Sequence, residues 1–145
     1  MKRFTRCICF LMVCVMLCAT TAFAAETVEP RASMFFVGSS VYFWHTSGNS
    51  YEIWFDVTGK GTMAEIGASE IEVQRSTDER NWTTVRTYYK EDYSQMTDTN
   101  TTHHADCVPF TATTGYSYRA IVYLYARNSS GTGNMRETTA ILDLR

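Results

Sequence analysis

The sequence predicts an all-β protein, an antiparallel β-sandwich of about seven short strands that follows a cleaved N-terminal leader. Three observations lead to this prediction. Apolar and polar residues alternate with a period of two in several segments, which is the pattern of a strand with one buried face. Turn-forming residues separate these segments at intervals of about ten residues. After the leader, no usable length of chain repeats apolar residues at helical spacing.

Residues 1–24 have the order of a secretory signal peptide. A basic start precedes an apolar run over 7–18, and Ala22-Phe23-Ala24 then supplies small residues at cleavage spacing. The apolar run has 12 residues, whereas a membrane-spanning helix needs about 20. We therefore expect a freely secreted, extracellular protein without a stable membrane anchor, cut after Ala24 or Ala25.

The composition of the mature chain excludes several classes of function. The leader contains four of the five cysteines, so Cys107 remains alone and no internal disulfide can form. The leader also removes three basic residues and no acidic ones, which moves the formal net charge from -2 to -5. No basic cluster is present, so we expect no nucleic-acid partner. A chain of about 120 residues suffices for one hydrophobic core.

We expect a flexible lead-in over residues 25–33 and a single sandwich domain over 34–145. Tyr51–Val57 shows the clearest alternation and 116–126 is the longest strand-like run. The segments expected to form strands are 41–44, 51–57, 70–74, 82–89, 116–126 and 138–144. The segments expected to form turns or loops are 59–61, 77–81 and 129–134. The expected core comprises Ile53, Phe55, Val57, Ile71, Val73, Tyr118, Val122 and Leu124.

Residues 112–128 resemble part of the fibronectin type III and immunoglobulin-like modules, in which a glycine precedes a strand-opening tyrosine by three residues. Gly115 and Tyr118 occupy these places, although Thr114 stands where proline is usual. The resemblance implies an immunoglobulin-like sandwich in which Tyr118 hydrogen-bonds to the backbone of the preceding corner. The whole chain also resembles small secreted proteins of unknown function from Gram-positive bacteria, through residues 31–33 and 65–69 and the Gly115-x-x-Tyr118 pair. Neither resemblance implies an activity.

The side chains that could support catalysis or metal binding form weak patterns. His103 and His104 are adjacent, so in a strand they point to opposite faces and cannot chelate one metal. Cys107 would share a face with His103, but it lacks the local sequence of a cysteine hydrolase. We expect no cofactor and no metal. A small secreted hydrolase built on these three residues, or on loop carboxylates, is the alternative hypothesis.

Aromatic residues on the outer faces of strands are the better candidates for a binding site. If the apolar positions of their strands face the core, Trp54, Tyr123 and Tyr125 face away from it, together with Ile121. Exposed aromatic patches of this kind bind proteins or carbohydrates. The alternative hypothesis is that loops, or the strand over 41–44, cover these rings. The sequence thus favours a non-catalytic binding or adhesion-type module whose partner is an extracellular protein or carbohydrate.

The leader gives a direct prediction. The exported protein should have the mass of a chain that begins at Ala25 or Glu26, because the cleavage signal ends at those positions. Intact-mass spectrometry of culture supernatant measures this. A full-length species retained in the cells would contradict the prediction.

Overall fold

The computed structural model describes residues 32–145. The signal peptide over 1–24, and the lead-in as far as Arg31, lie outside the described residues. Within them, no helix is long and apolar enough to cross a membrane. The elements are α2 (Ala32–Phe35), β1 (Phe36–Ser47), β2 (Ser50–Met63), β3 (Glu65–Ser76), β4 (Thr83–Tyr89), a 3-10 turn η1 (Ser94–Met96), β5 (Thr97–Asp98), β6 (Thr101–Thr111), β7 (Ser117–Asn128), β8 (Gly131–Thr138) and β9 (Leu142–Asp143).

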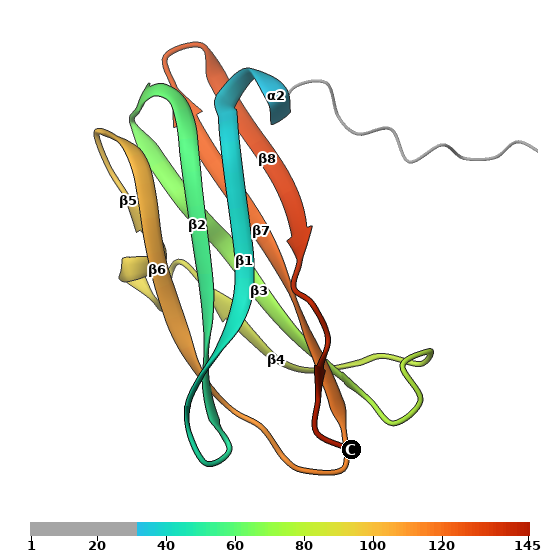
Figure 1. Cartoon of the computed structure of the whole chain (residues 1–145). Helices are drawn as coiled ribbons and strands as arrows, with labels where there is room; N and C mark the ends of the chain where they lie inside the picture. The colour runs from blue at the N-terminus through green and yellow to red at the C-terminus, as the bar shows by residue number, and fades with distance from the viewer. Residues whose placement is uncertain (1–31) are drawn as a thin grey trace, which may run out of the picture.

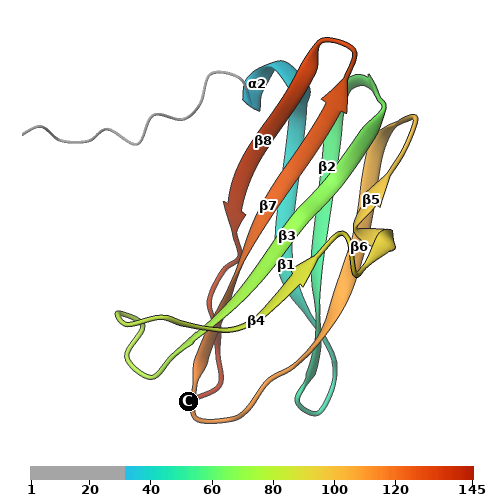
Figure 2. The same cartoon turned by 180° about the vertical axis from the view of Figure 1, so that it is seen from behind.

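The strands form two antiparallel sheets packed face to face, which confirms the predicted all-β sandwich (Figures 1 and 2). Sheet A has the order β1-β2-β6 and lies in front in Figure 1. Sheet B has the order β4-β3-β7-β8, and lies in front in Figure 2. The two-residue strands β5 and β9 pair with β3 and β7. Among the described residues, seven strands have seven or more residues, as the sequence predicted.

The core lies between the two sheets and follows from the alternation along β2. Tyr51, Ile53, Phe55 and Val57 are buried, whereas the residues between them are half-buried on the opposite side of the strand. On β7, the alternate residues from Tyr118 to Ala126 line the same interior. All eight predicted core residues are at most 2% exposed, so this prediction is confirmed.

Tyr118 makes the hydrogen bonds that the resemblance implied. Its hydroxyl donates to the Thr113 carbonyl at 3.1 Å and accepts the Thr113 backbone N–H at 2.9 Å. The ring is buried and packs edge-on against Phe110 of β6, with the ring centroids 5.2 Å apart. Tyr118 therefore fixes the corner where the chain passes from β6 in sheet A to β7 in sheet B.

Two expected turns were wrong because glycine was taken as a strand breaker. Residues 59–61 lie inside β2, where the pairing with β6 shifts register between Thr58 and Met63, and Gly61 takes a φ of +101° within this irregularity. Only Ser129 and Ser130 separate β7 from β8, so most of the loop expected over 129–134 is strand. A Cβ on Gly133 would come within 2.6 Å of the Phe35 ring, so this strand position requires glycine.

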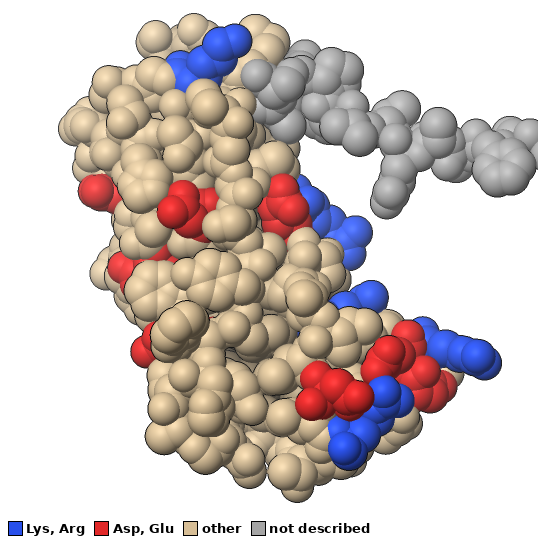
Figure 3. All heavy atoms as spheres, in the orientation of Figure 1, with Lys and Arg blue, Asp and Glu red and all other residues tan. Residues whose placement is uncertain are grey.

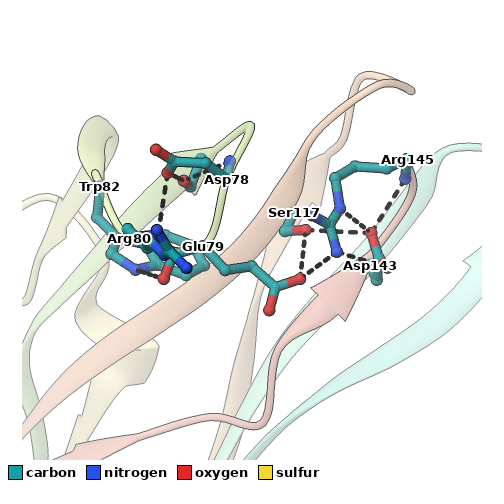
Figure 4. Close-up of polar contacts among 8 residues, drawn as sticks. Asp78, Glu79, Arg80, Trp82, Ser117, Asp143 and Arg145 are labelled. Carbon is teal, nitrogen blue, oxygen red and sulfur yellow. Dashed lines mark hydrogen bonds and ion pairs between the residues drawn. The ribbon is translucent and has the colours of Figure 1, made fainter.

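A polar network holds the C-terminal segment against the loop between β3 and β4 (Figure 4). The Ser117 hydroxyl lies 3.2 Å from Glu79 Oε1 and 3.1 Å from Asp143 Oδ1. The Arg145 guanidinium donates to both carboxylates. The network is partly exposed, so solvent and salt screen its ion pairs and these add little to stability. Its main effect is to fix the geometry at this end of the sandwich.

Truncation of the core should be costly. Phe55→Ala or Leu124→Ala should lower the free energy of unfolding by about 2–5 kcal/mol, because each removes a fully buried side chain and leaves a cavity. Urea denaturation followed by circular dichroism measures this. Val85→Ala, at a position that is 40% exposed, is the control and should change stability by less than about 0.5 kcal/mol. Equal losses in all three variants would contradict this description of the core.

Candidate functional site

The three aromatic residues predicted as a ligand surface lie on opposite sides of the sandwich. Trp54 is on the outer face of sheet A, at the middle of β2. Tyr123 and Tyr125 are on the outer face of sheet B, on β7. Each side chain points away from the core as expected, but the two sheets separate Trp54 from the tyrosines. They therefore cannot contact one small ligand together.

The outer face of sheet A carries Trp44, which at 59% is the most exposed aromatic side chain near a predicted site residue. Residues opposite one another on paired strands share a face, so the register defines rows across this sheet. One row contains Tyr42, Trp54 and Cys107, and the next contains Trp44, Glu52 and Pro109. Two aromatic side chains of β1 thus join Trp54 on a single sheet face.

The rings of Tyr42 and Trp54 have defined orientations on this surface. The Tyr42 and Trp54 rings are parallel, with an interplanar angle of 5° and centroids 6.5 Å apart. The Trp54 indole N–H donates to Glu52 Oε2 at 2.9 Å, which fixes the orientation of the indole. Tyr42 is 42% exposed and Trp44 is 59% exposed, so both rings are open to solvent. We call Tyr42, Trp44 and Trp54 the aromatic platform.

Polar groups adjoin the aromatic platform. Asp56 follows Trp54 on the same face of β2, and its Oδ1 lies 3.0 Å from Nε2 of His103 on β6. Glu52 lies between Trp44 and Pro109 and is half-buried. Carboxylate and imidazole groups therefore border the platform within sheet A, and they can accept or donate hydrogen bonds to a polar ligand.

The sequence did not identify Tyr42 and Trp44 as members of a site. The strand over 41–44 was one of the segments considered as a cover for the outer aromatics. In the structure β1 pairs edge to edge with β2, so it extends the outer face of sheet A and covers none of it. The alternation in 41–44 was the available signal, since Val41 and Phe43 pack against the core while Tyr42 and Trp44 are exposed.

The outer face of sheet B is more thoroughly covered by its own side chains. Tyr123 and Tyr125 are half-buried, and the Lys90 ammonium lies 4.4 Å from the Tyr125 ring centroid. Arg119 similarly covers the Trp82 ring, at 4.4 Å. Ile121 was expected to be exposed with the tyrosines, but it is only 2% exposed and lies between Glu72 of β3 and Thr138 of β8.

The structure does not bring together His103, His104 and Cys107, the residues of the hydrolase hypothesis. His103 points to the outer face and meets Asp56, whereas His104 points inward, where its ring packs on Phe55 and its Nε2 donates to the Gln95 carbonyl. Cys107 shares the outer face with His103 but is four residues away, which is about 13 Å along a strand. No proton transfer between them is feasible at that separation.

The environment of Cys107 also opposes catalysis. Partial burial, followed by the nearby Glu52 and Asp106 carboxylates, raises the pKa of the Cys107 thiol to about 11. A nucleophilic cysteine needs the opposite shift. Of the loop carboxylates, the Asp98 side chain accepts its neighbour's backbone N–H at 2.7 Å, and Glu91 and Asp92 are exposed in the turn after β4. Across residues 32–145, no three His, Cys, Asp or Glu side chains gather as a metal site would require.

Comparison of the chain with protein-family models, with curated proteins and with solved structures gives no match.

Cys107 should react slowly in the folded protein. Because the pKa of its thiol is raised to about 11, little thiolate is present at neutral pH, and the rate should rise with pH until that value is reached. Titration with a thiol-specific reagent at pH 8 should be roughly a hundredfold slower in native than in urea-unfolded protein. Equal rates in the two states would contradict the placement of Cys107.

Proposed function

We propose that this protein is a secreted, non-catalytic carbohydrate-binding module that holds its ligand on the aromatic platform of sheet A. The single observation that carries the proposal is the parallel Tyr42–Trp54 pair beside the exposed ring of Trp44. The C–H face of a sugar ring is apolar and flat, and it stacks on the face of an aromatic side chain. The secretion in this proposal is inferred from the signal-peptide-like leader over residues 1–24.

The surroundings of the platform support a sugar more than another apolar partner. Sugar hydroxyl groups need hydrogen-bond acceptors beside the stacked face, and Glu52 and Asp56 provide carboxylate oxygens in the rows that contain and adjoin the rings. His103 adds an imidazole next to Asp56. In the orientation of Figure 3 this face is largely uncharged, with scattered acidic groups, while basic groups lie toward the top and the right.

The shape of the site limits the kind of carbohydrate. The platform lies on a sheet face made of residues from adjacent strands. A row of side chains on such a face can contact several sugar units of an extended chain without enclosing one of them. We therefore expect a polysaccharide, or a long oligosaccharide, to bind better than a monosaccharide.

Binding to a polysaccharide panel tests the proposal. Wild-type protein should be retained by at least one polysaccharide in affinity electrophoresis, and Trp54→Ala or Trp44→Ala should weaken binding about tenfold, which corresponds to about 1.4 kcal/mol. The matched control is Tyr89→Ala, because Tyr89 is 46% exposed but belongs to sheet B. This variant should bind like wild type.

Three outcomes would overturn the proposal. The first is a wild-type protein that no glycan of the panel or of a printed array retains. The second is a Tyr89→Ala variant as impaired as Trp54→Ala, which would show a general loss of structure. The third is capture of an extracellular protein that depends on Trp54 in the absence of any glycan binding, which would make the platform a protein-binding surface.

A further inference from the structure

The free edges of the two sheets differ in how they are protected. A sheet edge exposes unpaired backbone N–H and C=O groups that can pair with another strand, and proteins protect edges with charges, proline, bulges or short strands. The described residues form four such edges, at β1 and β6 of sheet A and at β4 and β8 of sheet B. Three of these edges carry protective features, and the middle of the edge at β1 lacks them.

The edge at β6 is the most thoroughly protected. Pro109 has no N–H, and its carbonyl accepts a hydrogen bond from the Tyr88 hydroxyl. The Asp106 carboxylate accepts the backbone N–H of Cys107 at 2.6 Å. Asp106 also lies on the inner-facing side of its strand, opposite Phe55, so it is an inward-pointing charge. An additional strand would have to bury this carboxylate.

The edges of sheet B are protected by charged side chains and, at β4, by a short strand. The β4 strand has seven residues, contains Arg86, and pairs with β3 through a register shift. The β8 strand contains Arg136 and Glu137. Each of these features disfavours addition of another strand.

The edge at β1 has none of these features between Ser39 and Trp44. The strand runs for 12 residues from Phe36 to Ser47 and contains no proline and no Asp, Glu, Lys or Arg. Its register shifts fall at its two ends, near Val37 and near Thr46. Among residues 32–145, no side chain hydrogen-bonds to the backbone of residues 40–44. At the inner-facing position opposite Phe55, where β6 carries Asp106, β1 carries Val41.

We propose that the edge of β1 binds the β1 edge of a second copy of this chain, forming a symmetric dimer with a continuous six-stranded sheet. An antiparallel pair of identical strands satisfies the same backbone groups in both copies and closes after two subunits. A charged peptide would find no opposite charge on β1, whereas a second β1 presents a neutral strand of matching pattern.

One register of the β1–β1 pair places matching side chains opposite one another. Inner-facing residues must lie opposite inner-facing residues, and placing Tyr42 opposite its own copy achieves this. Val41 then lies opposite Phe43 of the second copy, which joins two partly buried apolar side chains that already contact the core. His45, the one basic side chain of β1, lies opposite Ser39, whose hydroxyl donates to Glu137 of β8 at 2.9 Å. In this register His45 thus lies opposite a residue that hydrogen-bonds to an acidic side chain.

This pairing also affects the aromatic platform. Tyr42 and Trp54 share a row, so placing Tyr42 beside its copy aligns four rings across the joined sheet. The dimer depends on the edge of β1 alone and does not require sugar binding by the platform. The two proposals are separable by experiment, because Trp54 lies on β2, away from the edge, and Trp54→Ala should leave the dimer intact.

Sedimentation velocity with reductant present tests the dimer, over protein concentrations from about 1 µM to about 1 mM. We expect the mass to rise with concentration from one chain to two. Val41→Asp copies the protection that Asp106 gives β6 and places like charges about 7–8 Å apart across the pair, so it should remain monomeric. The matched control is Val37→Asp, on the same strand but at the bulge, where Val37 is 70% exposed; it should dimerise like wild type.

Hydrogen exchange provides a measurement that needs no variant. Backbone amides of residues 40–44 should exchange more slowly at high than at low wild-type concentration, while amides of β6 should not change. The proposal is overturned if wild type is monomeric throughout, if Val41→Asp folds and still dimerises, if Val37→Asp dissociates equally, or if the added protection lies outside β1. If Val41→Asp fails to fold, the exchange pattern of wild type decides.

Discussion

The packing of β2 against β3 and β7 determines the rest of the molecule. Ile53 and Phe55 are fully buried between the sheets, and burial of each such side chain contributes about 1.5–3 kcal/mol. Since successive side chains on a strand point to opposite faces, burial of these two residues forces Trp54 outward. Pairing of β1 with β2 then places Tyr42 beside Trp54. The core and the aromatic platform are thus two consequences of one alternating pattern, and a shift of one residue in register would exchange them.

Local alternation made the core predictable but could not reveal how the strands are arranged. Each strand showed which of its residues face inward, and the eight expected core residues are buried for this reason. Alternation carries no information about which sheet a strand joins, so Trp54 and Tyr123 were grouped on one surface although they lie on opposite sides. The β6 strand was not among the expected strands, because its exposed Thr and His residues give it a polar composition. Gly133 was expected to lie in a loop. The Phe35 ring, which leaves no room for a Cβ at this strand position, is distant in sequence and gave no local signal.

The β1 strand takes part in both proposals, through different atoms. Its outward side chains supply two of the three rings of the platform, while its backbone forms the unprotected edge. Natural β-proteins usually keep exposed edges charged or short, so a long neutral edge calls for a physical reason for its persistence. Joining two such edges would bring together two of the proposed carbohydrate sites, and two linked sites hold a repetitive polymer more tightly than either site alone.

The positions of the chain ends have a mechanical consequence. The described chain starts at α2, at one end of the long axis of the sandwich, and Arg145 lies at the other end (Figure 1). Tension between these points would pull β1 and β9 along their own axes, so the interstrand hydrogen bonds of each ladder would be loaded together in shear. Bonds loaded together resist force better than bonds that open one at a time. A force applied between these two points would therefore act along the direction in which the sandwich best resists extension.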